Sequence, residues 1–235
     1  MGLKQSKETE DGPTDMATLL ILFANCYKKL KLPGSLIKEI FDFAGLHASS
    51  SSCSTRHLRG HSNQNEIYLS HKLPGGNLYF EPVLFLYEVT SKDQGWSSYS
   101  EHHGTYNGAY SWGEANLLIS DTGLSAEFFE AASSSSTKRH EVYRNLHAHK
   151  EWQDHVKEFG EDSKLLQTYK DVKRLLHSSL VGETVPSDIY LQLWLRSLYP
   201  GWLNQVKEAR MTVIWKLVHW EEFVIAKRAV LNRGT

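Results

Sequence analysis

The stretch Ile189-Tyr190-Leu191-Gln192-Leu193-Trp194-Leu195-Arg196 alternates strictly between apolar side chains and polar or amphipathic ones. Successive side chains of a β-strand point to opposite faces of its sheet, so this period of two predicts a strand with one buried face. Residues 211–217 alternate in the same way. Half-buried strands of this kind are typical of antiparallel sheets, which cover one face and leave the other to solvent.

Two earlier stretches extend the pattern. Residues 67–69 alternate, and so do residues 83–89, although Leu84 and Leu86 make the second stretch apolar on both faces. No strand–helix–strand rhythm separates these stretches, which disfavours a parallel sheet. We therefore expect a mainly β protein with one antiparallel β-sandwich, of the jelly-roll kind, over residues 66–218.

A helical spacing precedes the sandwich. Over residues 16–46 the apolar residues recur at intervals of three and four, the period of an amphipathic helix, with Leu32-Pro33 as an interruption and Gly45 as a stop. This region is predicted to be a headpiece of two helices. The same spacing predicts a helix inserted in the sandwich at about residues 164–177, and a closing amphipathic helix over residues 219–235.

Two segments show neither the period of a strand nor the spacing of a helix. Residues 1–15 are polar and predict a disordered tail. Residues 47–65 begin with a run of serines and stay polar to the end, which predicts a flexible linker between the headpiece and the sandwich.

The overall charge excludes some classes of partner. Among 235 residues, 26 basic and 27 acidic side chains give a net charge of −1, so no global field favours nucleic acid. The two cysteines lie in a helical pattern (Cys26) and in the serine run (Cys53), which argues against a disulfide and for a reducing compartment. Since no segment reaches the ~18 apolar residues of a membrane span, we expect a cytoplasmic protein.

The first residues carry a lipidation pattern. Met1-Gly2-Leu3-Lys4-Gln5-Ser6 matches the signal for N-myristoylation of Gly2, although so short a pattern also arises by chance. One acyl chain anchors a protein only marginally. The nearby acids Glu8, Glu10 and Asp11 offset the lysines, so any membrane attachment is expected to be weak.

The densest cluster of aromatic and small polar residues runs from Asp93 to Trp112. Glycines permit sharp turns there, and ring faces alternate with hydroxyl and amide groups, a mixture that suits a ligand pocket. The candidate ligand contacts in this stretch are Asp93, Trp96, Tyr106, Asn107 and Trp112. The alternative is an ordered loop whose rings close the end of the sandwich.

A second candidate is the turn Tyr199-Pro200-Gly201-Trp202, with Asn204 just after it. Proline followed by glycine is typical of a type II turn. The turn follows the strand whose second face carries Trp194 and Arg196. If that face is open, these two residues are ligand contacts together with Trp202 and Asn204; if it is covered, they are packing residues.

The histidines offer an enzymatic alternative. His147 and His149 would share one side of a strand, and with His155 they could hold a metal ion in a cupin-like site. The spacing of the nearby Glu151 does not fit such a site. No phosphate-binding loop, nucleophile elbow or zinc-protease motif is present, so no catalytic residue and no cofactor are assigned.

Three blocks carry a family resemblance. The central block, DQGWSSYSEHHGTYNGAYSWGEA at 93–115, the turn Tyr199-Pro200-Gly201-Trp202 with Asn204, and the Leu32-Pro33 helix resemble a family of uncharacterised fungal proteins. The resemblance implies a galactose-binding-like sandwich and an F-box-like first helix. It brings no established activity.

These observations lead to one principal hypothesis and two alternatives. The principal hypothesis is a non-catalytic recognition module whose aromatic loop and 199–204 turn meet at one end of the sandwich. Trp96, Tyr106, Trp112 and Trp202 would stack on a glycan or peptide, and Asp93, Asn107 and Asn204 would orient it. The alternatives are a ubiquitin-ligase adaptor that binds a Skp1-type partner through residues 32–44, and the metal-dependent enzyme.

Overall fold

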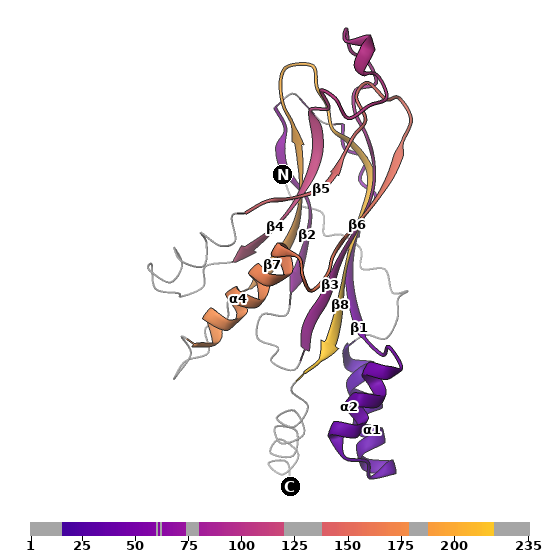
Figure 1. Ribbon diagram of the computed structural model, residues 1–235, viewed down its shortest axis with the longest axis vertical. Helices are drawn as coiled ribbons and strands as arrows, with labels where there is room; N and C mark the ends of the chain where they lie inside the picture. The colour runs from indigo at the N-terminus through magenta and orange to yellow at the C-terminus, as the bar shows by residue number, and fades with distance from the viewer. Residues whose placement is uncertain are drawn as a thin grey trace. The chain divides into compact units, whose positions relative to one another are not determined.

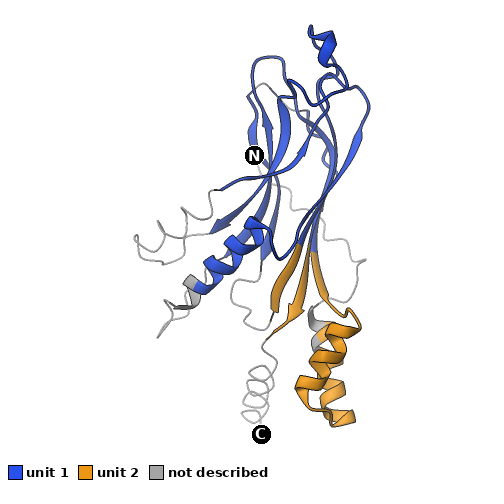
Figure 2. Ribbon diagram, in the orientation of Figure 1, with its two compact units in different colours: residues 1–9, 51–75, 85–212 blue, residues 10–50, 76–84, 213–235 orange. Residues whose placement is uncertain are grey.

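The computed structural model describes residues 16–59, 61, 63–73, 80–119, 138–178 and 188–218. They form two compact units (Figure 2). Unit 1 holds the described residues between 51 and 75 and between 85 and 212, and unit 2 holds those between 16 and 50, 80 and 84, and 213 and 218. The expected tail at 1–15 and closing helix at 219–235 lie outside the described residues.

Strands dominate the described part of the chain (Figure 1). They are β1 (Ala48–Ser54), β2 (Asn65–Leu73), β3 (Phe80–Lys92), β4 (Ser111–Ile119), β5 (His140–Arg144), β6 (Gln153–Phe159), β7 (Ile189–Ser197) and β8 (Gln205–Leu217). One sheet has the order β1-β8-β3-β6 and the other the order β2-β7-β4-β5. The fold is the expected antiparallel β-sandwich.

The strand pairing is nested. β4 pairs with β5, β3 with β6 and β2 with β7, all antiparallel, and β1 lies beside β8. The chain therefore folds back on itself as one long double ribbon that alternates between the two sheets. This is the connectivity of a jelly roll, an eight-stranded arrangement of two Greek keys, and the jelly-roll prediction is confirmed.

The alternating stretch at 189–196 lies at the centre of its sheet. β7 pairs with β2 on one side and with β4 on the other. Leu191, Leu193 and Leu195 are fully buried, whereas Trp194 and Arg196 on the other face are half-buried. The alternation therefore corresponds to a strand with one face in the core, as predicted.

The predicted linker at 47–65 is wrong, because residues 48–54 form β1 and Leu58 bridges to Val206. Serines fit this strand since their hydroxyls find partners: Ser52 Oγ lies 2.8 Å from His71 Nδ1. In unit 2, Ser50 Oγ accepts a hydrogen bond of 3.0 Å from the buried Trp215 indole. This run of small polar residues therefore forms a strand and not a linker.

β4, β5 and β6 carry no clean alternation and were not predicted. β4 is buried on both faces for most of its length, so its side chains give no period of two. Trp112, expected in the aromatic loop, is instead the second residue of this strand.

The two predicted headpiece helices and the predicted inserted helix are present. In unit 2, α1 (Met16–Leu30) and α2 (Gly34–Phe43) pack through the Phe23 and Phe41 rings, whose centroids are 5.9 Å apart. In unit 1, the inserted helix α4 (Lys164–Ser178) places Tyr169 edge-on against Phe85 at 6.1 Å. Within the described ranges, no helix has the length and apolar character needed to cross a membrane.

Gly113 of β4 is predicted to be required for stability. A Cβ atom at this position would lie 2.1 Å from Cε1 of the Tyr143 ring on the paired strand β5. Gly113→Ala should therefore lower the free energy of unfolding by about 1–3 kcal/mol through overpacking, measured by denaturant unfolding. Gly160→Ala is the matched control, since nothing lies within 4 Å of its Cβ position. Equal stability of the two variants would contradict the prediction.

Candidate functional site

The β3–β4 loop and the β7–β8 turn lie at the same end of unit 1 (Figure 1). Residues of both segments line an aromatic cavity of about 500 Å³. We call it the aromatic pocket. Its walls are Tyr99, His102, Gly108, Tyr110, His147, Tyr199 and Trp202. The Tyr110 ring lies edge-on to Tyr199 at 4.9 Å and to Trp202 at 5.1 Å. The loop and the turn thus meet as the sequence predicted.

Two hydrogen bonds donated by backbone N–H groups connect the two segments. The Leu198 N–H donates to the Tyr110 carbonyl at 2.9 Å, and the Leu203 N–H donates to Gln94 Oε1 at 3.3 Å. Tyr199 has a φ of 68°, a left-handed conformation that is costly for a tyrosine. Its side chain is 55% exposed at the rim. The turn therefore holds an aromatic ring in solvent at a conformational cost.

His147 forms a buried wall of the pocket. Its Nδ1 lies 2.9 Å from the Gly108 carbonyl, which can only accept, so Nδ1 carries the proton. Its ring is edge-on to Trp202 at 4.8 Å. Nε2 is buried and has no hydrogen-bond partner among the described residues. In the neutral imidazole Nε2 is consequently an acceptor.

The walls of the pocket are mainly aromatic. No Asp, Glu, Lys or Arg among the described residues lines the aromatic pocket. The polar groups on its walls are tyrosine hydroxyls, histidine nitrogens and the indole N–H, which donate or accept single hydrogen bonds. Such walls favour a ligand that is neutral, carries hydroxyl groups and has an apolar face.

Asp93, expected to contact the ligand, instead holds the loop together. It is buried, and its two carboxylate oxygens accept hydrogen bonds from the N–H groups of Gly95 at 2.7 Å and Ala148 at 2.5 Å. Burial raises the pKa of this carboxyl group, and the two backbone donors oppose the shift. Asp93 therefore fastens the β3–β4 loop to the segment that carries His147.

Asn204, also expected to contact the ligand, is fully buried beneath the pocket. Its Oδ1 accepts from Tyr143 Oη and Asn145 Nδ2, both at 3.1 Å. Its Nδ2 donates to the carbonyls of Trp112 at 2.6 Å and Arg196 at 3.2 Å. All its hydrogen-bonding capacity is used inside the protein, because a buried amide must be satisfied internally.

The same network continues through Asn145. Its Nδ2 also donates to Ser111 Oγ at 3.0 Å, and its Oδ1 accepts from Ser91 Oγ at 2.7 Å. We call Ser91, Ser111, Tyr143, Asn145 and Asn204 the buried network. It joins β3, β4 and β5 to the residue that precedes β8.

Trp112, Trp194 and Arg196 lie together on the outer face of β4 and β7, not in the pocket. Arg139 stacks over the Trp194 ring at 4.2 Å, and Arg144 over the Trp112 ring at 5.0 Å. Glu114 accepts from the Trp112 indole at 2.8 Å, and the Trp194 indole donates to Asn116 at 2.9 Å. These predicted ligand contacts are packing residues of a stacked arginine–tryptophan surface.

The remaining predicted loop residues are exposed. Trp96 is 66% exposed and Tyr106 is 61% exposed, and Asn107 is also on the surface. None of the three lines the aromatic pocket. Trp202 is therefore the one predicted contact that the structure brings to the pocket.

The pocket residues that the sequence did not assign to the ligand are Tyr99, His102, Gly108, Tyr110, His147 and Tyr199. All of them lie within stretches that had been singled out, His147 as a candidate metal ligand, so the composition of those stretches was the available signal. Which ring of a loop faces inward depends on the contact between the loop and the turn, and no local pattern encodes that contact.

The metal hypothesis is not supported by the geometry. Among the described residues, no group of three or more His, Cys, Asp or Glu side chains could hold a metal ion. His147 follows a strand and faces the pocket, whereas His155 is stacked on Tyr143 at 4.8 Å. Ala148 between the first two histidines has a φ of 53°, so His147 and His149 do not share the face of a strand.

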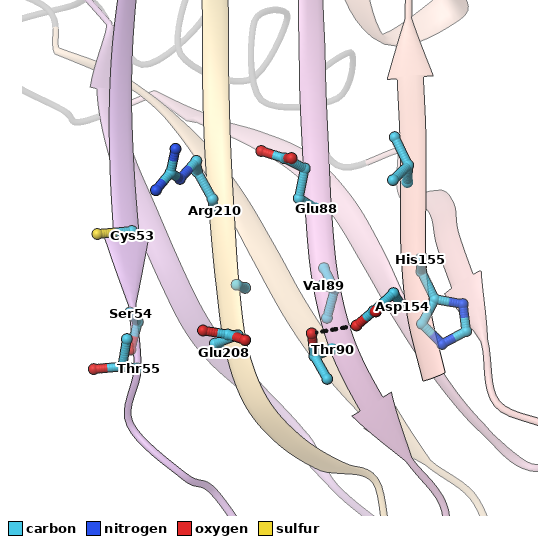
Figure 3. Close-up of a pocket in the computed structure, with 12 residues that line it drawn as sticks. Cys53, Ser54, Thr55, Glu88, Val89, Thr90, Asp154, His155, Glu208 and Arg210 are labelled. Atoms are coloured by element: carbon cyan, nitrogen blue, oxygen red, sulfur yellow. Dashed lines mark hydrogen bonds between the residues drawn. The ribbon is translucent and has the colours of Figure 1, made fainter. Parts of the chain in front are cut away.

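A second concavity, of about 600 Å³, lies on the outer face of β1, β8, β3 and β6. Figure 3 shows charged side chains pointing from neighbouring strands to the same side, among them Glu208, Arg210, Glu88 and Asp154. Thr90 donates to Asp154 at 2.7 Å. Among the described residues, His155 carries the one aromatic ring that lines this concavity. Its walls are those of a solvated sheet face, and the aromatic pocket is the better candidate site.

Comparison with known proteins gives no family: no family model matches the chain, and no curated protein matches it significantly.

Removal of the Asn204 amide is predicted to destabilise unit 1. Asn204→Ala would leave Tyr143, Asn145 and two carbonyls short of a partner, which should cost about 3 kcal/mol in the free energy of unfolding. The matched control is Asn107→Ala on the surface, which should change stability by less than about 0.5 kcal/mol. Thermal and urea unfolding measure both. If Asn204→Ala leaves the free energy of unfolding unchanged, the buried network is not needed for stability.

Proposed function

We propose that this protein is a non-catalytic recognition module that binds a glycan in the aromatic pocket. The observation that carries the proposal is the meeting of aromatic rings from two distant segments around a cavity of about 500 Å³ whose described walls include no Asp, Glu, Lys or Arg. This volume falls in the usual range for small-ligand sites, about 300–1,000 Å³.

The walls match a sugar better than a peptide. One face of a pyranose ring carries C–H groups and can stack on an aromatic ring, while its hydroxyls need single donors and acceptors. The tyrosine hydroxyls on the pocket walls offer such groups. A peptide segment would also present backbone amides in a row, and the described walls of the pocket include no strand edge that could pair with them.

The same walls argue for binding without catalysis. Most glycoside hydrolases use two carboxyl groups about 5–10 Å apart, and no carboxylate is among the described lining residues. The one buried acid among the described residues is Asp93, and both of its carboxylate oxygens accept hydrogen bonds from backbone N–H groups. The resemblance to galactose-binding-like sandwiches in the fungal family agrees with a sugar ligand.

The adaptor alternative depends on residues 32–44. Phe41 is buried against Phe23, whereas Phe43 is 95% exposed. The F-box-like face is therefore only partly free, and binding of a Skp1-type partner stays a prediction. A pull-down that recovers no such partner would contradict it.

For location, we propose a cytoplasmic protein with an acyl chain on Gly2, a residue outside the described part of the chain. The proposal rests on the pattern of the first six residues. An unmodified Gly2 on the mature protein from its native cell would contradict it.

Loss of a rim tyrosine is predicted to weaken glycan binding. A screen of neutral oligosaccharides should give a ligand for the wild-type protein. Tyr199→Ala should then reduce affinity about tenfold, because one stacking ring is lost. Isothermal titration calorimetry measures the change.

The matched control is Trp96→Ala. Trp96 is as exposed as Tyr199 but lies outside the pocket, so its removal should leave affinity unchanged. A ligand whose affinity falls with Trp96→Ala and not with Tyr199→Ala would place the site on the loop tip. A peptide found as the sole ligand class would overturn the glycan assignment.

A further inference from the structure

The helical pair of unit 2 exposes an unusual amount of apolar surface. Six large apolar side chains of α1 and α2 are between 40% and 95% exposed. They are Ile21, Leu22, Leu30, Leu36, Ile40 and Phe43. Scattered exposed residues are normal, but a contiguous set on a short helical pair marks an interaction surface.

Three of these residues form one stripe. Leu36, Ile40 and Phe43 are spaced at i, i+4 and i+7 along α2, so they lie on one face of the helix. The other face carries Ile37 and Phe41, which are buried. The helix is thus apolar on two faces, and the packing within unit 2 uses one of them.

Positive charge gathers at the connection that precedes α2. Lys28, Lys29 and Lys31 surround Leu30 at the connection from α1 to α2, and all four side chains are exposed. None of the three lysines forms an ion pair with another described residue, whereas Lys38 pairs with Asp42 at 2.5 Å. Lys31 has a φ of 54° and lies beyond the end of α1.

Stabilisation of the helix dipole explains only part of this arrangement. Lysines in the last turn of a helix stabilise its dipole, which accounts for Lys28 and Lys29. It does not account for Lys31 outside the helix, nor for a leucine that is 62% exposed between them. An apolar residue flanked by lysines that form no ion pair with another described residue matches a surface that is itself apolar beneath a negatively charged layer.

We propose that the α1–α2 pair docks on an anionic lipid surface. The lysines contact lipid phosphates and carboxylates, and Leu30 and Leu36 enter the interface with the rest of the α2 stripe. Charge complementarity favours lipid over a second copy of the chain, because two copies would bring like-charged lysines together. The inference does not depend on the proposed glycan pocket, which uses other residues.

This surface would also supply a second anchoring signal. A single acyl chain gives only marginal binding, and stable attachment needs a second contribution such as a basic patch. The Gly2 pattern and the lysine cluster belong to the same part of the sequence. The test below nevertheless uses unacylated protein, so that the helical pair is measured by itself.

The test is co-sedimentation of the full, unacylated chain with vesicles of phosphatidylcholine, with and without phosphatidylserine. Binding is expected on the vesicles that contain phosphatidylserine, and high salt should weaken it. The triple variant Lys28→Glu, Lys29→Glu, Lys31→Glu should bind on the order of 100-fold more weakly, since each lysine contributes about fivefold.

The matched control is Lys138→Glu, Lys157→Glu, Lys207→Glu, which makes the same change of net charge at exposed lysines of unit 1. It should retain most of the binding. A double variant, Leu30→Ser with Phe43→Ser, should bind more weakly although its charge is unchanged.

Several results would overturn the proposal. They are equal binding with and without phosphatidylserine, no binding to either vesicle, and equal loss in the two lysine variants. Capture of a Skp1-type protein or self-association through Leu30 and Phe43, without vesicle binding, would assign the surface to a protein partner instead. Glycan affinity of the same variants is an independent readout that none of these results would change.

Discussion

The buried hydrogen bond between the side chains of Asn145 and Asn204 is the contact on which the arrangement of unit 1 depends. Around it, Ser91, Ser111 and Tyr143 complete a network in which the donors and acceptors of both amides are used. Polar groups this deep are costly when unpaired. Three of the five network residues also lie within two positions of a pocket wall in sequence: Tyr110 precedes Ser111, His147 follows Asn145 by two positions, and Trp202 precedes Asn204 by two. The network therefore fixes the backbone from which the pocket is built.

The jelly-roll connectivity explains why such a network is needed. Nested pairing brings together strands that are far apart in the chain, so the loops at one end of the sandwich come from separate segments. Asn145 and Asn204 are 59 residues apart. Their hydrogen bond, with the Asp93 contacts above it, turns separate loops into one rigid site. A preorganised site loses little entropy when a ligand binds.

The fold could be predicted from the sequence wherever the spacing of apolar side chains reflects which face is buried. β7 and β8 alternate because one face is core, and α1, α2 and α4 carry the helical period. β1 was missed because serine hydroxyls can be satisfied inside a sheet, and β4 because both its faces are buried. The site was recovered as a region but not as a set of residues. Asn204 and Trp112 have the chemistry of ligand contacts, and burial, which local sequence does not encode, gives them structural roles.

The central claim, that the aromatic pocket is the binding site, can be tested with the seven tryptophan indole N–H signals of the protein in an NMR spectrum. Titration with a bound oligosaccharide should shift the Trp202 signal. Trp96 on the loop and Trp112 and Trp194 on the outer sheet face should keep their positions. A titration that shifts Trp96, Trp112 or Trp194 and leaves Trp202 unchanged would contradict the account.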